Sequence, residues 1–94
     1  MNSERIREEF EKLAERLGYS VRYEKGDFKG DACRINSENV IIINKLLPLR
    51  HQNFAFSRIF AEEDLSATSV LPAIRTMIEE VQAADAEGEG EENA

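Results

Sequence analysis

The chain has 94 residues and a formal net charge of -7, from 12 Lys and Arg against 19 Asp and Glu, which fits one small domain. No apolar run approaches the ~18–20 residues of a membrane helix, and the N-terminus lacks the apolar core of a signal peptide, so we expect no membrane attachment. A single cysteine and a single histidine exclude an intramolecular disulfide and a Cys/His zinc cluster. Together with the missing targeting signals, the lone cysteine favours a reducing cytoplasm.

The negative charge is concentrated at the C-terminus. Residues 85–94 contain five acids and no base, which leaves 14 acids against 12 bases over residues 1–84. The segment has no large apolar side chain whose burial would offset the ~1–2 kcal/mol per residue cost of ordering a backbone. We therefore expect one globular domain over 1–84 and a disordered acidic tail over 85–94. The tail either keeps the protein soluble or contacts a basic partner.

Helical spacing of apolar residues predicts a first helix over residues 3–17. Asn2 or Ser3 can cap its start by accepting a backbone hydrogen bond, and Gly18 can end it in the left-handed conformation. The residues of the apolar stripe are Ile6, Phe10, Leu13, Ala14 and Leu17.

Three strands follow. Alternation of Tyr19, Val21 and Tyr23 with polar residues predicts a half-buried strand, and a second strand is expected at about 31–36. Four β-branched residues in a row, at 40–43, predict a central strand over 40–44 that is covered on both faces and buries Ile42. We expect a small, mainly antiparallel three-stranded sheet.

Two further helices complete the predicted domain. Pro48 suits a helix start, and the helix after it should run over about 48–62. A third helix is expected over about 70–83, after a stretch of capping residues. The order is α-β-β-β-α-α, and helices segregated from such a sheet define the α+β class.

The loop over residues 26–31, Gly-Asp-Phe-Lys-Gly-Asp, is the most distinctive polar segment. Its charged residues and the first basic residue after it are the candidate ligand-binding set: Asp27, Lys29, Asp31 and Arg34. The loop lacks the spacing of a phosphate-binding loop and of a calcium loop, so the alternative is a turn bent at glycine beside the second strand.

Cys33 and His51 are the remaining candidates for chemistry. Cys33 is either a nucleophile, which needs a thiolate and a nearby base, or a buried and unreactive thiol on its strand. His51, early in the second predicted helix, is either a general base or pH sensor or an ordinary surface residue. No spacing brings the two together, so we expect no catalytic residue, no metal and no cofactor.

One segment resembles a known family. The run Val40–Asn44, followed by Leu47, Arg50, Phe54 and a helix to Glu62, is similar to the strand-to-helix segment of small zinc metallopeptidases of the ImmA/IrrE type. That resemblance implies the same α-β-β-β-α order. The motif HExxH of those enzymes aligns with 58–62, Arg-Ile-Phe-Ala-Glu, where both zinc-binding histidines and the catalytic glutamate are absent. It covers about 23 residues of the chain, and the chain also resembles small α+β proteins of bacteria.

These observations favour a non-catalytic binding or protein-interaction module, with a protein partner or a second copy in a homodimer. The alternative is a small ligand-binding domain or enzyme that uses the 26–31 loop, Cys33 or His51. Bases are too diluted by acids to form a nucleic-acid footprint, and no stripe of aromatic and basic residues is visible, so we expect no nucleic-acid partner.

Overall fold

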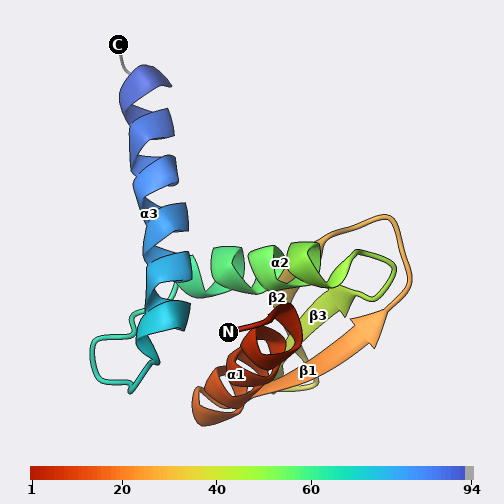
Figure 1. Ribbon diagram of the computed structural model, residues 1–94. Helices are drawn as coiled ribbons and strands as arrows, with labels where there is room; N and C mark the ends of the chain where they lie inside the picture. Colours follow the sequence, from red (N-terminus) through yellow and green to blue (C-terminus); the bar gives the residue numbers. More distant parts are fainter. Residues whose placement is uncertain (93–94) are drawn as a thin grey trace.

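A computed structural model describes residues 1–92 and confirms an α+β fold with three helices and one three-stranded sheet (Figure 1). The elements, in chain order, are α1 (Ser3–Arg16), β1 (Tyr19–Glu24), β2 (Gly30–Ile35), β3 (Glu38–Asn44), α2 (Leu49–Ala61) and α3 (Pro72–Glu92).

The signals at both ends of α1 are confirmed. The Asn2 side chain accepts a hydrogen bond from the Arg5 amide at 2.9 Å, which satisfies one of the free donors of the first turn. Gly18 follows the helix with a φ of 85°, a conformation that costs glycine little. The chain then enters β1 directly.

The sheet is mixed, so the expectation of a mainly antiparallel sheet is wrong for one of its two strand pairs. The strand order is β1-β3-β2, with β1 parallel and β2 antiparallel to β3. The loop after β1 passes the position that β3 later fills, which requires it to span about twice the ~4.8 Å strand spacing. Because the chain reverses direction twice, between β1 and β2 and again before β3, β1 and β3 run the same way.

A two-residue turn at Asn36 and Ser37 joins β2 to β3. Both residues have positive φ, 50° and 69°, which is the geometry of a type I′ hairpin turn. Such a turn fixes the register of β2 against β3, and β3 becomes the central strand as predicted.

Helices α1 and α2 cover one face of this sheet (Figure 1). Between the helices and the sheet lies a core that contains three stacked phenylalanines, Phe10, Phe56 and Phe60, with ring centroids 5.4–6.4 Å apart. Ile41 and Ile43 of β3 complete it from below.

The opposite face of the sheet carries no helix, which corrects two expectations. Ile42, predicted to be in the core, is only partly buried, because it points to this open face between Arg22 and Asp31 on the neighbouring strands. Cys33 is exposed rather than buried, because it sits on the same face of the edge strand β2. Val40 alone is fully buried there.

Helix α3 stands steeply across the end of α2 and extends away from the sheet (Figure 1). Ile74, Ile78 and Val81 are its buried residues. It starts at Pro72 and continues to Glu92, beyond the predicted end at 83. Residues 93–94 of the predicted acidic tail lie outside the described residues, and the disorder of 85–94 stays a prediction. Within residues 1–92, no helix combines the length and apolarity needed to cross a membrane.

Candidate functional site

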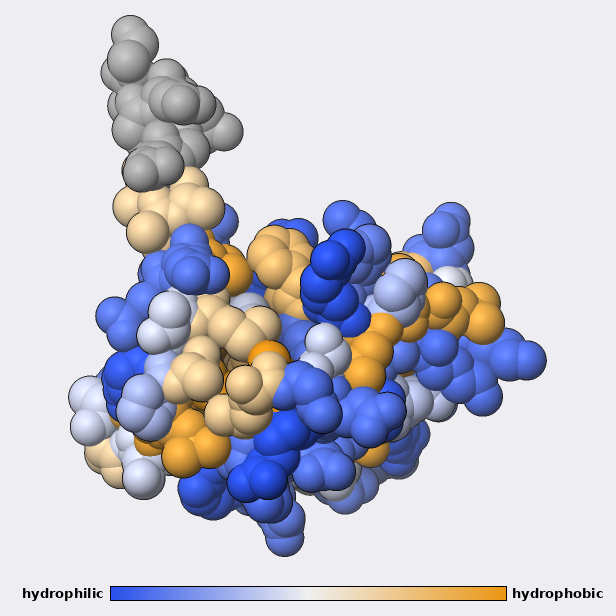
Figure 2. Space-filling view, in the orientation of Figure 1, coloured by the Kyte–Doolittle hydropathy of each residue, from blue (hydrophilic) through white to orange (hydrophobic). Residues whose placement is uncertain are grey.

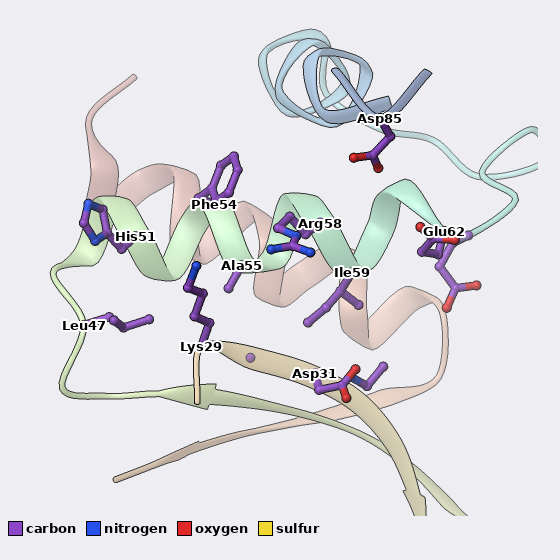
Figure 3. A pocket seen from close by; sticks show the side chains of 13 residues that line it. Lys29, Asp31, Leu47, His51, Phe54, Ala55, Arg58, Ile59, Glu62 and Asp85 are labelled. Carbon is purple, nitrogen blue, oxygen red and sulfur yellow. The ribbon is translucent and has the colours of Figure 1, made fainter. Parts of the chain in front are cut away.

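A groove of about 610 Å³ runs between α2 and the outer edge of β2 (Figure 3). Helix α2 provides one wall and the start of β2 the other, while α3 borders one end. The side chains and backbone that line it belong to Lys29, Gly30, Asp31, Ala32, Leu47, His51, Phe54, Ala55, Arg58, Ile59, Glu62, Glu63 and Asp85.

The floor of the groove is built from small residues. A Cβ added to Gly30 would lie 3.1 Å from the Ala55 Cβ and 2.9 Å from the Ile43 Cδ1, so glycine lets α2 approach β2 closely at this point. Ala32 lies two residues further along β2, on the same face of the strand. The small side chains leave the space that larger residues would fill.

Helix α2 packs one face into the core and turns another toward the groove. The groove residues lie at spacings of three and four: His51, Phe54, Ala55, Arg58 and Ile59 on α2, with Glu62 directly after the helix ends. Ala55 lies between the two faces and also belongs to the core. Phe54 is the largest apolar residue on this side of the helix and remains 53% exposed. The opposite side of the molecule, where α1 lies in front, shows hydrophobic surface interrupted by hydrophilic residues (Figure 2).

The edge of β2 that faces the groove has unused backbone groups. Lys29 O accepts a hydrogen bond from the Asn44 amide at 3.0 Å, which determines which residues of β2 direct their backbone groups toward β3. In an antiparallel pair these bonds alternate, so Gly30, Ala32 and Arg34 direct their N–H and C=O groups away from β3. The Ala32 amide donates to the Asp31 carboxylate at 2.9 Å, which confirms that the sheet does not use it.

The two ends of the groove carry different charges. Lys29 and His51 lie at the end where α2 begins, and Glu62 lies at the end where α2 finishes, with Asp85 above from α3 (Figure 3). The helix dipole adds partial positive charge at the first end and partial negative charge at the second. Arg58 is the one base among the lining residues of the second half.

The acidic end is tied to the sheet. The Tyr19 hydroxyl on β1 donates a hydrogen bond to the Glu63 carboxylate. This hydrogen bond, together with burial of the phenol and repulsion from the carboxylate, raises the pKa of Tyr19 to about 12. Glu63 is therefore held in place, whereas Glu62 is exposed at the mouth of the groove.

The loop that leads into β2 is held by Asn44. Its side-chain amide donates to Gly26 O at 2.9 Å and to Phe28 O at 2.8 Å, and its oxygen accepts from the Leu46 amide at 3.0 Å. Asn44 is only 6% exposed, so its buried side-chain amide depends on these bonds rather than on water. The contacts set where Lys29 enters the groove.

The structure brings together only part of the set proposed from the sequence. Lys29 and Asp31 line the groove with His51, whereas Asp27 is an exposed loop residue and Arg34 lies on β2 beyond the groove. Cys33 belongs to the opposite face of the sheet, away from His51.

Sequence reasoning missed the contribution of α2. Phe54, Arg58 and Ile59 form a second stripe on that helix, which Glu62 continues just after the helix ends. The only sign of this stripe in the sequence is an apolar arc wider than one core face needs. Arg58 and Glu62 occupy the ends of the segment compared with HExxH. Across residues 1–92, no group of three His, Cys, Asp or Glu side chains is arranged to hold a metal ion.

Comparisons with protein-family models, curated proteins and solved structures found no match for this chain.

Proposed function

We propose that the protein is a non-catalytic interaction module that binds an extended segment of a partner protein in the groove between α2 and β2. In this mode the segment adds a strand to the free edge of β2, and its alternate side chains contact α2. The observation that carries the proposal is the combination of an edge of β2 whose backbone groups do not pair with β3 and an exposed apolar residue, Phe54, on the facing helix.

A peptide suits this groove because main-chain hydrogen bonds supply affinity that does not depend on sequence, while side-chain contacts with α2 supply selectivity. The absence of any contact between Cys33 and His51, which lie on different faces of the sheet, supports a binding role over nucleophilic catalysis. The single cysteine suits a reducing compartment, which supports a cytoplasmic location.

A small amphiphilic ligand is the second candidate for the same groove. The groove volume of about 610 Å³ falls within the roughly 300–1,000 Å³ typical of small-molecule sites. Such a ligand would contact Phe54 and Ile59 without pairing with the β2 backbone.

Backbone NMR with a short β-forming peptide at millimolar concentration tests strand addition. We expect the amide signals of Gly30, Ala32 and Arg34 to shift and their hydrogen exchange to slow on binding, because these groups acquire partners. Ala32→Pro removes one edge donor without touching the ladder to β3, and it should weaken binding strongly. Phe54→Ala should weaken it about tenfold, whereas Leu71→Ala, a truncation of another exposed apolar residue outside the groove, should not.

Three results would contradict the proposal. Binding that leaves the β2 edge amides unprotected would favour a small-ligand site. A peptide-free dimer in light scattering, with the same amides already protected, would make a second copy of the chain the occupant. No binding of any β-forming peptide would remove the groove as a protein-binding site.

A further inference from the structure

We propose that the bound segment is basic at one end: it places a lysine or arginine at the acidic end of the groove, two residues from an apolar side chain seated beside Ala55. This inference rests on the proposed function, because it specifies which extended segment the groove selects.

The charges of the groove select this chemistry. Glu62, Glu63 and Asp85 border the end where α2 finishes, and the C-terminal dipole of α2 adds to their negative potential. Glu63 already accepts a hydrogen bond from Tyr19, which keeps its charge at the groove rather than out in solvent. A base at this end therefore meets three carboxylates.

Arg58 limits where that base can sit. Its guanidinium lines the middle of the groove, one helical turn before Glu62, and it repels a base placed beside it. The lysine or arginine of the segment must therefore lie past Arg58, toward Glu62. At the other end Lys29 disfavours a second base, so the basic residue is confined to one end of the segment.

The spacing of the proposed motif follows from helix and strand geometry. Ala55 and Glu62 are seven residues apart, which is about 10.5 Å along α2 at the helical rise. Side chains on one face of a strand are separated by about 6.6–6.8 Å. The long side chain of a lysine or arginine two residues from the apolar position spans the remaining distance. The apolar position of the segment, two residues from the base, faces Ala32 and Ala55, which line the groove with small side chains that a branched apolar residue can cover.

Matched peptides test this specificity. In the first peptide, threonine occupies every second position, and the positions between are valine, isoleucine and lysine in that order. A second peptide has the reverse order, because a strand can add to β2 in either direction. A third and a fourth peptide replace the lysine by glutamate. We expect one lysine peptide to bind at least fivefold more tightly than its glutamate counterpart at low salt, and the difference to shrink in high salt.

Variants locate the effect. Glu62→Gln should weaken the lysine peptide about threefold and leave the glutamate peptide unchanged or slightly improved, as expected for one partly exposed charge pair. Glu62→Lys should reverse the preference. Glu15→Gln, which removes the same charge from an exposed position of α1, is the matched control and should change neither affinity.

The outcomes separate the two proposals. Equal binding of lysine and glutamate peptides, with protection of the β2 edge amides, overturns the basic-end inference and leaves strand addition standing. A lysine preference that Glu62→Lys does not reverse also overturns it. Failure of all four peptides to bind overturns the proposed function itself.

Discussion

Gly30→Ala probes the narrowest contact between α2 and β2, on which the shape of the groove depends. The added Cβ would lie 2.9 Å from Ile43 Cδ1, 3.1 Å from Ala55 Cβ and 3.3 Å from Ile42 O. The two carbon–carbon distances are shorter than the ~3.5–4.0 Å at which carbon atoms pack best. The substitution must therefore move α2 or distort side chains in the core.

Two opposing effects set the size of the change in stability. Overpacking by one methyl group costs roughly 1–3 kcal/mol. Replacing glycine restricts the unfolded chain, and because Gly30 has no positive φ, alanine recovers about 0.4–1 kcal/mol. We expect a net loss of about 0.5–2 kcal/mol in the free energy of unfolding, measured by urea denaturation.

A double-mutant cycle with Ile43→Val identifies the cause. Ile43→Val removes the Cδ1 atom that forms the shortest contact, and on its own it should cost about 0.5–1.5 kcal/mol. In the Gly30→Ala background the same change should cost less or even stabilise, since it relieves the clash. A Gly30→Ala protein as stable as the parent would refute the close approach of α2 to β2, and strictly additive losses would refute the clash between the new methyl group and Ile43 of β3.

Three further predictions concern the sheet and its surroundings. Ile42→Asp should leave a folded protein destabilised by roughly 1–2 kcal/mol, whereas Ile41→Asp should unfold it, because only Ile41 is fully buried; circular dichroism and urea denaturation distinguish these results. Asn44→Ala should cost about 2–4 kcal/mol, since it leaves three backbone groups without partners, and retention of parental stability would show that water replaces the side chain. Folding raises the pKa of Tyr19 from 10.0 to about 12, so the stability linked to its protonated form is fully present below pH 10 and lost as the pH rises through 12. In urea denaturation, Tyr19→Phe should be less stable than the parent at neutral pH and should lose less stability between pH 10 and 12. An equal loss in both proteins would show that another group titrates in this range.

The elements with strong local signals were predictable. Asn2 and Gly18 fix the ends of α1 by hydrogen bonding and backbone freedom, which are properties of single residues. The β-branched run that forms β3 was correctly placed at the centre of the sheet. In these cases the physics that decides the structure acts within a few residues.

Features that depend on distant neighbours were not predictable in the same way. A loop between β1 and β2 is compatible with adjacent strands or with a gap that β3 fills, so the parallel pair left no local trace. Burial of Cys33 depends on which sheet face the helices cover, and alternation along a strand is the same for either face. The outward stripe of α2 was similarly ambiguous, because Phe54 extends an apolar arc that the core does not need in full.

In the proposed binding mode, the free edge of β2 must accept one partner strand without uncontrolled association. An unpaired edge invites pairing with any extended chain, and proteins limit this with charged side chains and short edges. Here Asp31 and Arg34 charge a strand of only six residues, which Lys29 directly precedes. The Asp31 carboxylate occupies the Ala32 amide that an incoming strand would need. A partner must displace that carboxylate and make up the loss through contacts with α2. Nonspecific strands lack the contacts with α2 and cannot displace the Asp31 carboxylate. A segment that matches the apolar wall and the charges of the groove can displace it.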